Sequence, residues 1–105
     1  MAVQRHIPLF AAALAMTVLS APMAHAGKIE SACKQSGRPV AGPQVCHCIQ
    51  QVADRMLTSS DQKLAATFFK DPHRAQEIRM SDKRRDETFW DRYIRFGNAA
   101  ARSCS

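Results

Sequence analysis

The triplet Cys46-His47-Cys48 carries the side chains of this 105-residue chain that are best suited to metal binding or redox chemistry. Thiolate and imidazole groups are common zinc ligands, but zinc sites usually space their cysteines by two to four residues. Thiol oxidoreductases use Cys-x-x-Cys, and covalent haem attachment uses Cys-x-x-Cys-His. Because the triplet has none of these spacings, a metal- or thiol-handling protein is only an alternative interpretation, and no cofactor is expected.

Other groups that carry out catalysis have structural explanations. Ser59, Ser60 and Ser81 stand where helices are expected to begin, and serine is a preferred N-cap residue. Carboxylates interspersed with lysine and arginine are typical of solvated helix faces. Those in question are Asp71, Glu77, Asp82, Asp86, Glu87 and Asp91. We therefore expect a protein that is not an enzyme.

Two groups of aromatic residues recur at helical spacing, namely Phe68-Phe69 and Phe89 with Trp90 and Tyr93. Aromatic residues in such a pattern more often form a core, and a small domain needs them there. They are also the residues that line small-molecule sites. A small-ligand carrier with an aromatic pocket is therefore a second alternative.

The last helix expected in the chain has a basic side. Three cations stand in its first turn, where positive charge opposes the helix macrodipole. Ion pairs such as Asp91 with Arg95 account for part of the charge. The rest forms a candidate partner-binding surface, and its residues are Lys83, Arg84, Arg85, Arg92, Arg95 and Arg102.

Apolar residues recur at helical spacing through much of residues 43–104, and no alternating run of β-branched residues predicts a strand. We expect a short turn or helix around Ile29 to Lys34, followed by a loop. The first firm helix runs from Pro43 to Leu57. The second begins with a capping box of Ser59 and Gln62 and ends at Lys70, before a proline.

A third, short helix is expected with Asp71 as its N-cap and Pro72 in its first turn. Its apolar residues are Ala75, Ile78 and, at its end, Met80. A fourth helix, capped by Ser81 or Asp82, has the most regular apolar stripe. That stripe comprises Phe89, Trp90, Tyr93, Ile94, Gly97, Ala100, Ala101 and Cys104. The predicted fold class is all-α, a small disulfide-stapled bundle of three to four helices.

Residues 1–26 have the layout of a cleavable secretory signal peptide. Arg5 supplies a positive n-region, the apolar run from Leu9 to Leu19 has 11 residues, and Ala24-His25-Ala26 is a cleavage triplet. A permanent membrane helix needs about 20 apolar residues, so we expect cleavage after Ala26. Residues 27–105 are then a single periplasmic or secreted domain.

The four cysteines of such a domain are expected to form two disulfides, because disulfides persist outside the reducing cytoplasm. A bond between Cys46 and Cys48 would disrupt the helix, since side chains two residues apart point about 200° apart. Each other scheme joins one of these residues to Cys33 and the other to Cys104. Spacing does not choose between Cys33–Cys46 with Cys48–Cys104 and Cys33–Cys48 with Cys46–Cys104.

Four stretches support a resemblance to a known group of proteins. They are VCHCIQQVAD (45–54), SDQ (60–62), FFKDPHRAQE (68–77), and Ser81-Asp82 followed by Phe89-Trp90. Through them, residues 33–104 resemble a family of small exported bacterial proteins that have no established activity and are sometimes labelled "arginine transporter". The resemblance implies no catalytic residue. A transporter must span the membrane, and residues after 26 contain no sufficiently long apolar run, so it implies at most an accessory part of an envelope system.

The charge of residues 27–105 favours anionic partners. Without Arg5 the chain has 14 lysines and arginines against 9 aspartates and glutamates. The sequence therefore predicts a non-enzymatic exported interaction module that binds an envelope protein or an anionic surface through its basic helix. We expect no nucleic-acid partner.

Overall fold

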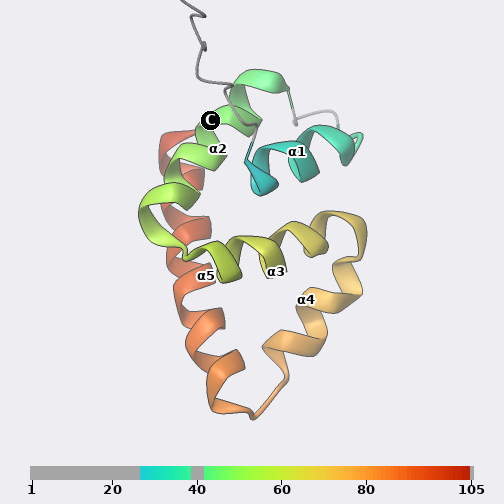
Figure 1. The fold of residues 1–105 in the computed structure, drawn as a ribbon, viewed down its shortest axis with the longest axis vertical. Coiled ribbons are helices and arrows are strands. Elements are labelled where there is room, and N and C mark those ends of the chain that lie inside the picture. The colour runs from blue at the N-terminus through green and yellow to red at the C-terminus, as the bar shows by residue number, and fades with distance from the viewer. Residues whose placement is uncertain (1–26, 39–41, 105) are drawn as a thin grey trace, which may run out of the picture.

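The computed structural model describes residues 27–38 and 42–104, and these form five α-helices without a strand (Figure 1). The helices are α1 (Lys28–Gln35), α2 (Pro43–Met56), α3 (Ser59–Lys70), α4 (Pro72–Arg79) and α5 (Arg84–Ser103). The predicted all-α, disulfide-stapled fold is confirmed, and the segment expected as a short turn or helix is the complete helix α1. The predicted signal peptide lies outside the described residues. Within the described residues, no helix combines the length and apolar character of a membrane span.

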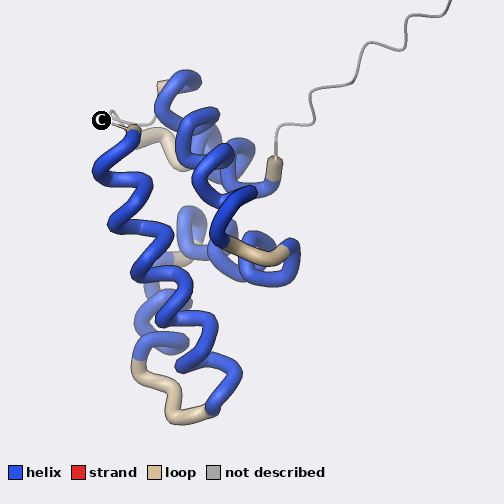
Figure 2. Tube along the Cα trace, turned by 90° about the vertical axis from the view of Figure 1, so that its left-hand side faces the viewer, coloured by secondary structure: helices blue, strands red, loops and turns tan. Residues whose placement is uncertain are grey.

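Helix α5 is the longest element, about 30 Å at the α-helical rise per residue. It runs along one side of the fold, and α2, α3 and α4 all pack against it (Figure 1). The view at right angles shows α5 extending along the edge of the molecule from the α4–α5 turn to the last described residues (Figure 2). Helix α1 packs mainly against α2 and α3.

The core draws residues from all five helices. Its buried members are Ile29, Val52, Ala53, Leu57, Ala65, Phe68, Ile78, Phe89, Phe96 and Ala100. Helix α1 contributes Ile29, which is fully buried, and Cys33, four residues on, is 2% exposed. Residues four apart lie on the same helix face, so this face buries the otherwise polar α1 against its neighbours.

The buried face of α5 is turned relative to the predicted stripe. Phe96, which the stripe omits, is 6% exposed, whereas Ile94 is 46% exposed. Gly97 and Ala101 are exposed as well. The face turns because α5 must meet α3 and α4 as well as α2. Met80, expected as the last apolar residue of the short third helix, is instead the C-cap of α4 and is 82% exposed.

The helix caps also differ from those predicted. Helix α3 is capped by Thr58, whose hydroxyl accepts from the Asp61 N–H (3.1 Å) while Asp61 accepts from the Thr58 N–H (3.2 Å). The capping box therefore begins one residue before Ser59. Asp71 does precede α4, but its side chain makes no cap hydrogen bond, and Lys83 rather than Ser81 or Asp82 is the N-cap of α5.

The disulfides are Cys33–Cys46 and Cys48–Cys104, with Cα–Cα distances of 5.6 and 5.7 Å. The structure thus selects one of the two schemes that spacing left open. Cys46 and Cys48 lie on opposite shoulders of α2, so one reaches α1 and the other reaches the end of α5. All four cysteines are paired.

A buried amide, Gln50 of α2, joins three helices through its side chain. Its oxygen accepts from the Glu30 N–H of α1 (2.9 Å), and its nitrogen donates to Asp54 and to Gln62 of α3, both at 2.8 Å. Gly27, the N-cap of α1, lies directly against this amide. Since a buried amide is costly to leave unpaired, Gln50 fixes α1 and α3 relative to α2.

Gly27→Ala tests this contact, because a Cβ at position 27 would overlap the side-chain amide of Gln50. We expect the free energy of unfolding of the oxidised protein to fall by roughly 1–2 kcal/mol in urea denaturation. Gly42→Ala is the matched control, since Gly42 is the N-cap of α2 and a Cβ there meets no neighbour. Equal effects of the two substitutions would contradict the assigned role of Gln50.

Candidate functional site

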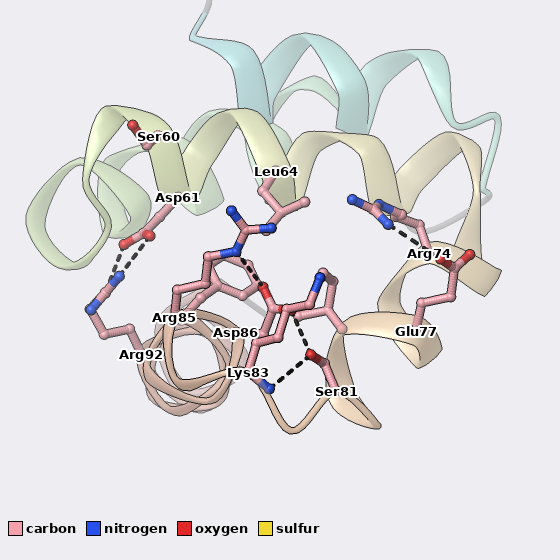
Figure 3. Close-up of a pocket in the computed structure, with 12 residues that line it drawn as sticks. Ser60, Asp61, Leu64, Arg74, Glu77, Ser81, Lys83, Arg85, Asp86 and Arg92 are labelled. Carbon is pink, nitrogen blue, oxygen red and sulfur yellow. Dashed lines mark hydrogen bonds and ion pairs between the residues drawn. The ribbon is translucent and has the colours of Figure 1, made fainter.

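A groove of about 570 Å³ lies between α3, α4 and the start of α5 (Figure 3). Its apolar lining comes from Leu64, Ile78 and Phe89, one residue from each helix. Phe89 and Ile78 are buried core residues, so the core itself forms this part of the groove. The volume falls within the usual range of binding sites, about 300–1,000 Å³.

An ion pair between Asp61 and Arg92 lies at one side of the groove (Figure 3). The guanidinium donates from Nε and from an Nη to the two carboxylate oxygens, both at 2.8 Å. These hydrogen bonds are the main reason why the pKa of Asp61 lies below its ordinary value, and the Thr58 N–H adds to the effect. Arg92 is therefore occupied in joining α5 to α3, although the sequence suggested it as a partner-binding residue.

A second part of the lining comes from the turn between α4 and α5, which lies between the Asp61–Arg92 pair and the Arg74–Glu77 pair (Figure 3). Ser81 donates to Asp86 (2.6 Å) and accepts from the Lys83 N–H (3.2 Å). Arg85 Nε lies 3.7 Å from Asp86. Among the described residues, the Lys83 ammonium has no ion-pair partner. The turn therefore holds Lys83 and Arg85 at the groove (Figure 3).

The remaining predicted cations lie away from the groove. Arg84, Arg95 and Arg102 share the outer face of α5, by their spacing of 11 and 7 residues. Arg95 pairs with Asp91 at 3.2 Å, as expected. The six candidate residues thus do not form one surface. Lys83, Arg85 and Arg92 line the groove, where Arg92 is paired with Asp61, and the other three face outward.

Arg74, which no pattern in the sequence singled out, lines the groove from α4 and pairs with Glu77 at 3.3 Å. Its three-residue spacing from Glu77 places the two side chains on one face, and this was the available signal.

The triplet Cys46-His47-Cys48 presents only its imidazole, because both sulfurs are in disulfides. His47 Nδ1 lies 2.7 Å from the buried carboxylate of Glu30, and this hydrogen bond is the main cause that lowers the pKa of Glu30. Lys34 adds a longer pairing with Glu30 at 3.3 Å. Within residues 27–38 and 42–104, no cluster of three or more His, Cys, Asp or Glu side chains is suited to a metal ion.

The predicted aromatic residues are divided between two sites. Phe68, Phe69 and Tyr93 line a separate pocket of about 230 Å³, together with Arg38. Phe89 belongs to the groove, and Trp90 packs on the Tyr93 ring at a centroid distance of 5.2 Å. The contribution of Arg38 was missed, because it follows α1 and is 55 residues from Tyr93 in the sequence.

The groove combines an apolar lining with cations and carboxylates on its sides. This combination suits a partner that carries both apolar and charged groups, which can contact the lining and pair with the sides. The chain matches no protein-family model, no curated protein and no solved structure.

Acid unfolding tests the Asp61–Arg92 pair. Because the pKa of Asp61 is lowered by folding, the stability it contributes is present above about pH 4 and is lost as the pH falls through the folded-state pKa. We expect Asp61→Asn to lower the free energy of unfolding by about 2 kcal/mol at pH 7. Between pH 5 and pH 3, the free energy of unfolding of this variant should fall less steeply than that of the wild-type protein. Urea denaturation at a series of pH values measures both.

Glu87→Gln is the control, since Glu87 is an exposed carboxylate of α5 without an ion pair among the described residues. It should keep the wild-type acid dependence. An Asp61→Asn protein with that same dependence would show that the pair does not stabilise the fold.

Proposed function

We propose that the protein is a non-enzymatic interaction module, exported to the periplasm or secreted, that binds an acidic segment of an envelope protein. The binding surface is the groove, which Lys83 and Arg85 line, together with the adjoining start of α5, where Arg84 faces outward beside it. This assignment agrees with an accessory role in an envelope system, as the resemblance of residues 33–104 implies.

The observation that carries the proposal is the set of three adjacent cations, Lys83, Arg84 and Arg85, at the N-terminal end of α5. Positive charge there is unfavourable, because the helix dipole is positive at the same end. The only ion pair of the three within the described residues is the 3.7 Å approach of Arg85 to Asp86. Since these three charges contribute little to the stability of the fold, binding of an anionic partner would account for their presence.

The groove favours a polypeptide segment over a uniformly anionic surface. Glu77 and Asp86 line it beside Arg74, Lys83 and Arg85, and a bilayer of anionic headgroups would repel these two carboxylates. A peptide can instead donate N–H groups to them while its own acidic side chains meet the cations. Its apolar side chains can contact the lining.

Export is supported by two features of the described residues. Both disulfides fit an oxidising compartment. Gly27, which follows the predicted cleavage triplet, is already the N-cap of α1 and packs on Gln50.

The intact mass of the protein recovered from the producing cell's periplasm or medium tests the proposed export and cleavage. We expect the mass of a chain that begins at Gly27. A mass that includes residues 1–26 would contradict cleavage after Ala26.

Binding is tested with a fluorescent twelve-residue peptide in which Glu and Leu alternate, by anisotropy at low and at moderate salt. We expect affinity to fall as salt rises. The triple variant Lys83→Gln, Arg84→Gln and Arg85→Gln should weaken binding about tenfold, as the loss of three partly screened ion pairs implies.

A second triple variant, Lys28→Gln, Lys63→Gln and Lys70→Gln, removes the same charge from exposed positions on α1 and α3. It should retain most of the affinity. Equal losses of peptide affinity in the two triple variants would show that binding depends only on net charge and would contradict the proposed surface. Binding to phosphatidylglycerol vesicles without binding to the peptide would replace the polypeptide partner with an anionic membrane surface.

A further inference from the structure

The pocket beside Tyr93 has walls that are suited to a flat ring. Phe68 and Tyr93 meet edge to face, with centroids 5.3 Å apart and planes at 88°, and so form a corner. Phe69 adds a third ring to the lining. Aromatic rings attract one another in edge-to-face and offset arrangements, so a ligand ring in this corner gains contacts of the same kind.

The Tyr93 ring is held in place before any ligand binds. Phe89 stacks on it at 5.7 Å, Trp90 lies at 5.2 Å and Phe96 at 6.0 Å. With Phe68, four rings therefore surround it. Binding at a wall that is already fixed avoids the entropy cost of ordering side chains.

Two polar groups of the pocket make no hydrogen bond or ion pair with their side chains within the described part of the fold. The Tyr93 hydroxyl has no hydrogen-bond partner there, and it is not sealed from solvent. The Arg38 guanidinium also lacks an ion pair there. Burial raises the pKa of Tyr93 and the charge of Arg38 opposes this, so the phenol is a protonated donor at neutral pH and lies within electrostatic reach of the guanidinium.

The volume limits the size of the ligand. An apolar cavity of about 150 Å³ takes up a benzene molecule, so the 230 Å³ of this pocket leaves room for a ring and one small substituent. A hydroxyl donor and a guanidinium together favour a carboxylate as that substituent.

We propose that this pocket binds a small aromatic carboxylate, with the ring against Phe68 and Phe69 and the carboxylate at Tyr93 and Arg38. The site is separate from the groove, because none of these four residues lines it. The protein is then a carrier or sensor of such acids in addition to its proposed interaction with a polypeptide.

Benzoate is the probe, and Trp90 is the reporter. The chain contains one tryptophan, and its indole contacts the Tyr93 ring, so ligand at Tyr93 should change its emission. We expect saturable binding with a Kd on the order of 1 mM, as is typical of a ligand this small. Benzamide, which has the same shape without the charge, should bind at least about fivefold more weakly.

Tyr93→Phe removes the hydroxyl and keeps the ring, and Arg38→Gln removes the charge. Each should weaken benzoate binding about fivefold or more. Benzamide binding should also fall with Tyr93→Phe, because the amide carbonyl accepts from the same hydroxyl, but it should change little with Arg38→Gln. Arg79→Gln is the control, since Arg79 is exposed on α4 and does not line the pocket. Circular dichroism establishes that each variant is folded.

Three results with benzoate, benzamide and the pocket variants would overturn the proposal, and a fourth result concerns the groove variant. The first three are no saturable change with benzoate, equal affinity for benzoate and benzamide, and equal behaviour of the Arg38→Gln and Arg79→Gln proteins. Loss of benzoate binding in the Lys83, Arg84 and Arg85 triple variant would also overturn it, because that result would place the ligand in the groove.

Discussion

The rest of the structure depends on two covalent bonds that leave α2 two residues apart. Cys46 is bonded to Cys33 on α1, and Cys48 is bonded to Cys104 at the end of α5. In the chain-entropy account, loops with sequence separations of 13 and 56 contribute about 3 and 4 kcal/mol respectively. Hydrophobic burial in a domain of this size rarely contributes more than about 3–5 kcal/mol net, so the cross-links account for a large share of its stability.

The Cys48–Cys104 bond holds the C-terminal end of α5 to α2, and the N-terminal half of α5 is then positioned by side chains. Asp61 and Arg92 join it to α3, and the aromatic cluster around Tyr93 fills the space between them. The groove and the Tyr93 pocket lie beside these side-chain contacts, where α3, α4 and α5 converge. Both sites therefore rest on core side chains that the fold already fixes.

The sequence was sufficient where the signal was local. Helical spacing predicted α2 to α5, and the geometry of Cys46 and Cys48 reduced three disulfide schemes to two. It was insufficient where the outcome depends on packing between helices. The orientation of α5, with Phe96 buried and Ile94 exposed, depends on the positions of α3 and α4. The pairing of Arg92 with Asp61 joins residues 31 apart in the sequence. No local sequence pattern predicts this pairing or the position of Arg38 beside Tyr93.

The most direct test of this account is thermal unfolding of the oxidised protein compared with the same protein in excess reductant, with alkylation to verify that all four thiols are free. Since about 1 kcal/mol corresponds to 4–8 °C in a domain of this size, loss of both cross-links should lower the Tm by at least about 20 °C or leave the chain unfolded at room temperature. A fully reduced protein with an unchanged Tm would contradict the central role given to the two disulfides.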